Sequence, residues 1–134
     1  RSDFENWDGD LGQHIAVVLG DSMGEMQLYY GACDIAFIGG SLLALGGQNL
    51  IEACALGKPV LLGPHTFNFE EASKEAVLAQ AAIRVQDARA LFEQAQLLLD
   101  DTVLRKKMGE NASAFSLQHQ GATKRTLALL TRYF

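Results

Sequence analysis

The chain has 134 residues, of which 49% are hydrophobic and 20% charged, enough apolar material for one globular domain and too much for wholesale disorder. No apolar run reaches the roughly 18 residues of a membrane-spanning helix, and no basic segment followed by an apolar one suggests a secretory signal. The net charge of −5 disfavours nucleic acid as the main partner. An anionic ligand would therefore have to be bound by backbone N–H groups and a few cations.

The cysteine content excludes a disulfide-rich scaffold. The two cysteines, Cys33 and Cys54, both lie inside apolar stretches. Their positions favour small buried hydrophobic side chains in a reducing cytosol over a disulfide bridge or a metal site. We therefore expect no metal ion at either cysteine. No cofactor is expected either.

Short apolar runs alternate with segments of helical spacing along the chain. In chain order, the pattern predicts a strand at 14–19, a helix at 23–33, a strand at 35–38, a helix at 49–56, a strand at 59–62, a helix at 69–81, a strand at 83–85 and a helix at 88–99. Asn49 is the expected N-cap of the second helix, and Gly57 is its expected left-handed terminator. Such alternation is typical of parallel βαβ units with helices on both faces of the sheet.

Two further helices are expected at the end of the chain, one capped by Asp100 or Asp101 and reaching about residue 115, the other after Gly121. Their basic residues fit either a solvated face or a contact with an anionic membrane or another domain. The predicted fold class is α/β, a partial doubly wound, Rossmann-like parallel sheet followed by C-terminal helices. Because a doubly wound domain has strands on both sides of its switch point, the chain is expected to be a piece of a larger protein.

Glycine-rich loops follow the predicted strands, at the edge of the sheet where ligands of open α/β folds bind. These loops cover residues 20–24, 39–41 with 46–49, and 63–66. Glycine allows close approach to a ligand, and the helix N-termini that follow offer unpaired N–H donors. Three such loops on one rim indicate a phosphate site, although any one of them could be a simple turn.

Glu52 follows the second loop in the first turn of its helix and has two interpretations. In one, it completes a capping box by bonding back to the N–H of Asn49. In the other, its carboxylate accepts two hydrogen bonds from the cis-diol of a ribose.

Three other polar residues near the loops are open to more than one interpretation. His65 could be a hydrogen-bonding loop residue or a contact to a nucleotide-sugar donor. Asp21 could orient its own loop through the backbone, and Lys58 could stabilise a helix end.

Several sequence blocks carry a resemblance to a known family. These blocks are Gly-Asp-Ser-Met-Gly-Glu at 20–25, residues 34–41, Gly-Gly-Gln-Asn at 46–49 with Glu52, residues 57–60, and Gly-Pro-His-Thr-Phe-Asn-Phe at 63–69. Together they resemble the C-terminal half of the bacterial 3-deoxy-D-manno-octulosonic acid (Kdo) transferases, which are GT-B glycosyltransferases. The resemblance runs along almost the whole chain.

The resemblance implies an enzyme of lipopolysaccharide synthesis that moves Kdo from CMP-Kdo to a lipid A precursor without a metal-dependent nucleotide site. Residues 1–134 would be the C-terminal CMP-Kdo-binding domain. The absent N-terminal domain would hold the acceptor and the catalytic base, so the fragment alone is expected to be inactive. The full-length protein would contact the inner membrane peripherally, on its cytoplasmic side.

The resemblance also implies roles for individual residues. Gly39, Gly40 and Ser41 would line the phosphate. Asn49 and Gln48 would help to hold the phosphate, and Glu52 would bind the ribose. The expected remaining contacts are Met23, Gly24 and Glu25 bordering the nucleotide, His65 at the donor, and Arg1 with Ser2 reaching toward it.

The chain departs from the family pattern at three positions. Gln48 stands where the family usually has His, while Leu50 and Ala53 stand where prolines are frequent. A glutamine amide can donate to an oxyanion but cannot titrate. A proton-shuttling role is therefore not expected at position 48.

Two alternatives remain open at this stage. The chain could be the donor domain of another GT-B transferase that uses a different nucleotide sugar. It could also be a non-catalytic α/β module whose glycines serve only as turns.

Overall fold

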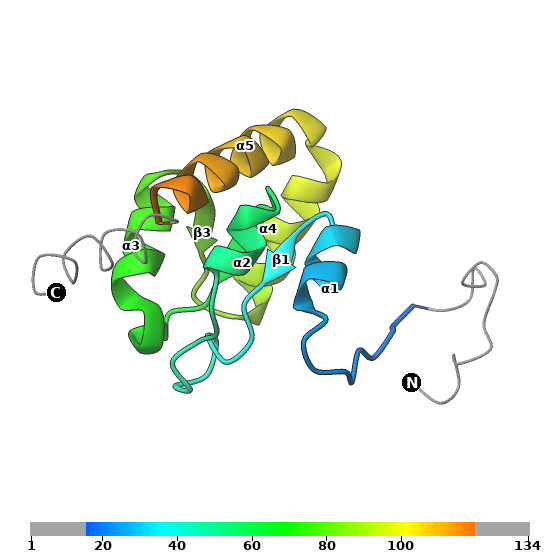
Figure 1. The fold of residues 1–134 in the computed structure, drawn as a ribbon, viewed down its shortest axis with the longest axis vertical. Coiled ribbons are helices and arrows are strands. Elements are labelled where there is room, and N and C mark those ends of the chain that lie inside the picture. The colour runs from blue at the N-terminus through cyan, green and yellow to red at the C-terminus, as the bar shows by residue number, and fades with distance from the viewer. Residues whose placement is uncertain (1–15, 120–134) are drawn as a thin grey trace, which may run out of the picture.

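A parallel three-stranded sheet organises the computed structural model, which describes residues 16–119 (Figure 1). The strands are β1 (Ala36–Phe37), β2 (Val60–Leu62) and β3 (Ala82–Arg84), in the order β1-β2-β3. The helices are α1 (Met26–Ala32), α2 (Ile51–Ala55), the 3-10 helix η2 (Phe67–Phe69), α3 (Glu70–Leu78), α4 (Ala88–Asp100) and α5 (Thr102–His119). The predicted α/β class and the parallel sheet are confirmed.

The central strand β2 shows how the sheet is covered on both faces. Val60 and Leu62 are buried in one hydrophobic cluster with side chains from α2, α3 and α5. Leu61, which points the other way, is buried in a second cluster with Leu98 of α4 and Met108 of α5. The strand is apolar throughout because successive side chains point to opposite faces of the sheet and both faces are covered.

The helix boundaries follow two of the predicted capping signals, Gly57 and Asp101, whereas the N-cap of α2 is Leu50 and not the expected Asn49. Gly57 has φ of +67° and ends α2. The Asp87 carboxylate caps α4 by accepting a hydrogen bond from the Ala90 N–H at 2.8 Å. Asp101, one of the two expected candidates, caps α5 by accepting from the N–H of Leu104 at 2.9 Å.

The strand predicted at 14–19 is wrong for its described part, residues 16–19. These residues form no strand, and Val17 is 85% exposed. A β-branched apolar run becomes a strand only beside a hydrogen-bonding partner, and none of the described strands pairs with it. Arg1 with Ser2 and the predicted last helix lie outside the described residues.

The helix predicted at 23–33 begins later than expected. Gly24 has φ of +78°, and α1 starts after Glu25. Helical spacing predicts that Met26, Tyr29, Tyr30 and Cys33 share one side of this helix. Tyr30 and Cys33 pack against the hydrophobic cluster of Val60 and Leu62, the main cluster, whereas Met26 and Tyr29 remain exposed. A helix of only seven residues thus presents a narrower buried face than the sequence pattern suggested.

The two cysteines do not form a disulfide. Cys54 is buried in the main cluster and Cys33 packs against it, as predicted for small hydrophobic side chains. Burial raises the pKa of the Cys54 thiol to about 12. The thiol therefore stays protonated near neutral pH.

Candidate functional site

The loops that follow β1 and β2 meet at the carboxyl end of the sheet. Ser41, in the loop after β1, is fully buried. Its hydroxyl donates to the carbonyl of Ile38 and accepts a hydrogen bond from the N–H of Gly63 at 2.9 Å. The backbone N–H of His65 donates to the Ser41 carbonyl at 2.9 Å. Ser41 therefore joins the two loops through both its side chain and its backbone.

The loop before α2 is joined to both of these loops. The N–H of Gly47 donates to the carbonyl of Gly40 at 3.1 Å, and that of Asn68 donates to the Gly46 carbonyl at 3.1 Å. The Asn68 amide nitrogen lies 3.3 Å from the carbonyl oxygen of Leu45 and 3.4 Å from that of Gly47. The hydrogen bonds make one connected rim of three chain segments.

Two glycines in this rim have a structural requirement. Gly46 has φ of +90°, and a Cβ there would lie 2.5 Å from the Asn68 amide nitrogen. A Cβ on Gly63 would lie 2.2 Å from the carbonyl oxygen of Ser41. Gly46 is thus required mainly by its positive φ, and Gly63 by the close approach of the Ser41 backbone.

The first turn of α2 places a carboxylate beside the rim. The Asn49 side-chain oxygen accepts from the N–H of Ile51 at 3.0 Å, and its amide nitrogen donates to Glu52 at 3.1 Å. The hydrogen bond to Glu52 thus comes from the side chain of Asn49, whereas a capping box would use its backbone N–H. Because α2 starts at Ile51, Glu52 is its second residue, one position earlier than expected.

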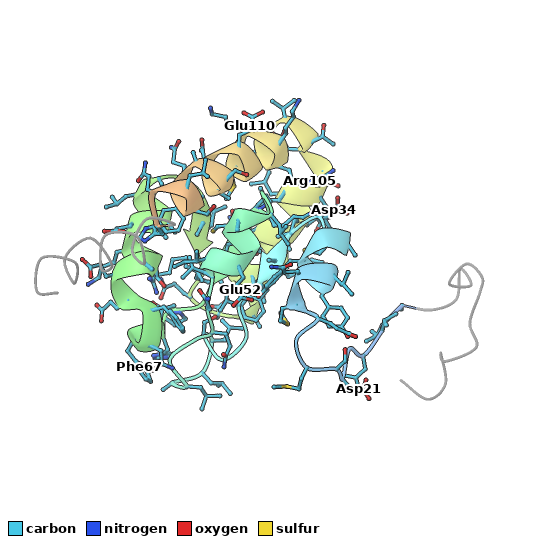
Figure 2. All side chains as sticks on the ribbon, viewed as in Figure 1. Asp21, Asp34, Glu52, Phe67, Arg105 and Glu110 are labelled. Carbon is cyan, nitrogen blue, oxygen red and sulfur yellow. The ribbon has the colours of Figure 1, made fainter. Side chains whose placement is uncertain are left out.

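Glu52 is exposed and lies near the centre of the molecule beside α2 in Figure 2. Burial, followed by the negative charge of Glu52, raises the pKa of Tyr30 on α1. The Glu52 carboxylate is therefore near enough to α1 to act electrostatically on the Tyr30 hydroxyl.

The structure brings together most of the residues that the sequence analysis assigned to the site. Gly39, Gly40, Ser41, Gln48, Asn49, Glu52 and His65 all belong to the connected rim or to the turn that follows it. Gln48 is exposed, as is the side chain of His65.

Residues 23–25 lie in a different segment. Met23 is 97% exposed, and Glu25 accepts hydrogen bonds within its own turn, from Ser22 and from the Tyr29 hydroxyl at 3.5 Å. Asp21, in the same segment, lies apart from Glu52 at the edge of the molecule in Figure 2.

Sequence reasoning missed Arg84. Its Nη1 atom donates to the carbonyls of Gly63 at 3.0 Å and Pro64 at 3.3 Å, and to the Thr66 hydroxyl at 3.0 Å. With His65 and Lys74, Arg84 lines a cavity of about 320 Å³ outside the rim. The available signal was a single cation inside the short apolar strand predicted at 83–85, and Arg84 is the last residue of the observed strand β3 (Ala82–Arg84).

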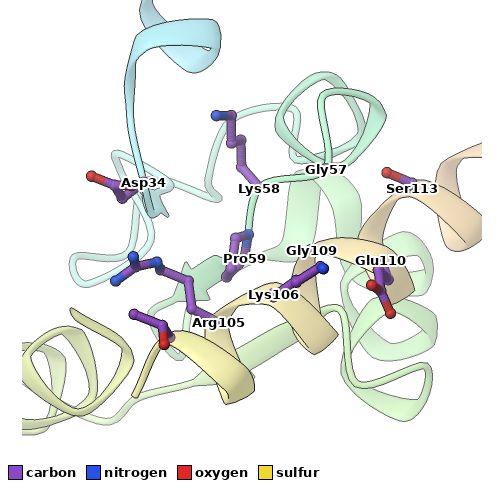
Figure 3. A pocket seen from close by; sticks show the side chains of 10 residues that line it. Asp34, Gly57, Lys58, Pro59, Arg105, Lys106, Gly109, Glu110 and Ser113 are labelled. Atoms are coloured by element: carbon purple, nitrogen blue, oxygen red, sulfur yellow. The ribbon is translucent and has the colours of Figure 1, made fainter. Parts of the chain in front are cut away.

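A second cavity, of about 390 Å³, lies at the amino end of the sheet. Figure 3 shows Asp34 and Lys58 on one side of it, and Arg105, Lys106 and Glu110 of α5 on the other. Lys58 donates to the carbonyl of Gly31 at 3.2 Å, in the last turn of α1. Lys58 thus stabilises the end of α1, whereas the sequence suggested the end of α2, the helix that precedes it.

Residues 16–119 contain neither a metal-binding cluster nor a membrane-spanning helix. No group of three or more His, Cys, Asp or Glu side chains is placed to hold a metal ion. No helix in this range combines the length and the hydropathy needed to cross a membrane.

Comparisons with known proteins agree with the geometry. The family model described as Glycosyl transferases group 1 matches residues 5–115. A 3-deoxy-D-manno-octulosonic acid transferase from Bordetella pertussis is 53% identical over 91% of this chain and 28% of that protein. The corresponding Haemophilus influenzae transferase is 40% identical over 90% of this chain and 29% of that protein.

A solved structure is also similar to this chain. It is the C-terminal CMP-Kdo binding domain of WaaA from Acinetobacter baumannii, with a TM-score of 0.69 and 32% sequence identity. The match covers 72% of this chain and 51% of that domain. The resemblance to Kdo transferases is confirmed, and the chain spans less than a third of the length of the two transferases compared above.

Proposed function

Because this chain belongs to the Glycosyl transferases group 1 family, we propose that residues 1–134 form the C-terminal, CMP-Kdo-binding domain of a Kdo transferase. The longer protein would move Kdo from CMP-Kdo to a lipid A precursor in lipopolysaccharide biosynthesis. The similarity to Kdo transferases and to a CMP-Kdo binding domain supports this function.

One observation carries the proposal: three glycine-containing segments are hydrogen-bonded into one rim beside the carboxylate of Glu52. A ribonucleoside monophosphate needs acceptors for its ribose diol and donors for its phosphate. Glu52 would supply the acceptors, held in place by the Asn49 amide. The backbone of Gly39 and Gly40, which unlike Ser41 is not buried, and the exposed Gln48 amide would face the phosphate.

Ser41 would act mainly by fixing its loop, because the whole residue is buried. Its hydroxyl already donates to the Ile38 carbonyl, inside the protein. The side chain fixes the loop, and the fixed loop presents its backbone to the ligand. Donors that are in place before the ligand arrives stabilise a leaving phosphate without reorganisation.

The proposed division of labour follows from the chemistry of the transfer. This domain would bind the donor and stabilise the departing CMP. The rest of the longer protein would bind the acceptor and supply the base that deprotonates its hydroxyl. The longer protein would work at the cytoplasmic face of the inner membrane, through peripheral contact. The 134-residue chain alone would transfer nothing, and detectable transfer by it would contradict this division.

The test is a titration of the 134-residue chain with CMP, followed by amide chemical shifts, with UDP and GDP as competitors. We expect localised shift changes at residues 39–41 and 49–52 and no displacement by UDP or GDP. Preferential binding of UDP or GDP at the same residues would assign the domain to a transferase with another nucleotide-sugar donor. An absence of localised changes would leave a non-catalytic module.

A further inference from the structure

Arg84, the last residue of β3, is hydrogen-bonded to the turn at residues 63–66, some twenty positions earlier in the chain. A single nitrogen, Nη1, lies 3.0 Å from the Gly63 carbonyl, 3.3 Å from the Pro64 carbonyl and 3.0 Å from the Thr66 hydroxyl. Arg84 is half-buried, and Thr66 is only 5% exposed. Charge-assisted hydrogen bonds away from bulk water are about twice as strong as neutral ones.

The turn held by Arg84 is the one that supports Ser41. The N–H of Gly63 donates to the Ser41 hydroxyl, and the N–H of His65 donates to the Ser41 carbonyl. Arg84 contacts the carbonyls of Gly63 and Pro64, so it fixes the two peptide groups that follow the Gly63 N–H, the second of which carries the His65 N–H. A shift of the turn would therefore move the loop that carries residues 39–41.

We propose that Arg84 is a positioning residue for the nucleotide site: it holds residues 63–66 where they fix Ser41 and the loop before it. The inference rests on the proposed function, because the site it positions is the proposed CMP site. Arg84 does not touch the ligand in this proposal. It acts through the hydrogen bonds that join the turn to Ser41.

Arg105 offers a matched control within the same chain. Its Nη1 atom also donates to two backbone carbonyls, those of Leu98 at 3.1 Å and Leu99 at 2.9 Å. Like Arg84, it is half-buried and lines a cavity. The carbonyls that it contacts belong to the last turn of α4, and the cavity that it lines lies at the amino end of the sheet. Removing the Arg105 side chain should therefore affect stability but not CMP binding.

The experiment compares R84A, R84K and R105A in the 134-residue chain. CMP affinity is measured by calorimetry well below the melting temperature of each variant, and thermal unfolding is measured separately. We expect R84A to weaken CMP binding about tenfold, the scale of losing charge-assisted hydrogen bonds. R84K, which keeps the charge, should recover part of the affinity, and guanidinium ion added to R84A should recover part of it too.

R105A should lower the melting temperature while leaving CMP affinity within about twofold of the unchanged chain, because its bonds lie far from the site. A purely structural role for Arg84 would make R84A behave like R105A, and that result would overturn the proposal. So would an R84A affinity equal to that of the unchanged chain.

A second measurement needs no ligand and separates this proposal from the proposed function. In R84A the amide signals of Ser41 and Gly47 should shift, whereas in R105A they should stay in place. If the unchanged chain does not bind CMP, the proposed function fails, and these amide shifts still decide whether Arg84 positions the loop. Unmoved Ser41 and Gly47 signals in R84A would refute the inference on their own.

Discussion

The two ends of the sheet look alike at first inspection. Each has a cavity of similar size, about 320 Å³ at the carboxyl end and about 390 Å³ at the amino end. Each has an arginine that donates to backbone carbonyls, Arg84 or Arg105. Each also has a glycine at which a Cβ would strike a neighbouring backbone, Gly63 or Gly109.

The ends differ in what their close contacts join. At the amino end, Gly109 lets α5 approach Gly57, so the contact packs a helix onto a turn. At the carboxyl end, the close contacts and hydrogen bonds join three loops and leave exposed polar groups beside them. We therefore base the proposed site on loops that are fixed to one another beside exposed polar groups, and not on the presence of a cavity or of a positive charge.

The largest effect should come from Gly63→Ala. The added Cβ would lie 2.2 Å from the Ser41 carbonyl oxygen and 2.5 Å from the Leu42 nitrogen, both backbone atoms that cannot move aside easily. We expect a loss of about 3 kcal/mol in the free energy of unfolding, measured by urea denaturation. Gly39→Ala is the control in the same rim, because no atom lies within 4 Å of its added Cβ. Equal stability of the two variants would show that the rim is not tightly joined.

Glu52→Ala tests the binding side of the comparison. We expect it to cost about 1–3 kcal/mol in CMP affinity, since it removes a charged acceptor of two hydrogen bonds. Glu110→Ala removes an exposed carboxylate from the cavity at the amino end and should leave the affinity unchanged. Calorimetric titration of both variants with CMP measures the two affinities. If Glu52→Ala binds CMP as well as the unchanged chain, Glu52 does not bind the ribose.

Ser41→Ala should destabilise the chain by about 2 kcal/mol, because the buried N–H of Gly63 loses its acceptor. Ser73 of α3 is equally buried, but its hydroxyl has no hydrogen-bond partner among the described residues. Ser73→Ala should therefore be neutral or stabilising. Urea denaturation of the two variants sharpens the contrast between a serine that joins loops and one that only fills space.

The last prediction concerns the core between the two ends. The pKa of Cys54 is about 12 in the folded chain, against 9.0 for an unperturbed thiol. The unfolded chain therefore releases a proton first, and stability should fall as pH rises from about 9 toward 12, by about 1.4 kcal/mol per pH unit. Denaturation at pH 8 and pH 10.5 measures the fall, and Cys54→Ala should reduce it. An identical slope in that variant would contradict the assignment to Cys54.

Local patterns predicted the elements with strong signals. Gly57 ends one helix and Asp101 begins another where the sequence placed them, because caps depend on interactions between near neighbours. The segment at 16–19 has an equally strong strand pattern and forms no strand. A strand needs a partner that may be distant in sequence, and no local pattern supplies one.

The candidate site divides in the same way. Glycine spacing and the position of Glu52 directed the prediction to the carboxyl end of the sheet, because strand-end loops of a parallel sheet share one edge. The sequence could not show that the Ser41 hydroxyl turns inward to accept from the Gly63 N–H, or that Arg84 holds the turn that contains Gly63. Both depend on contacts between residues some twenty positions apart.

The order of residues alone thus predicted the α-helices and strands that follow residue 25, because short-range propensity dictates them. It also predicted which loops meet at one edge of the sheet, because parallel strands run in one direction. Only the tertiary structure decided how these loops are joined and which cation joins them. Hydrogen bonds between distant segments form only after the sheet has brought their donors and acceptors within reach.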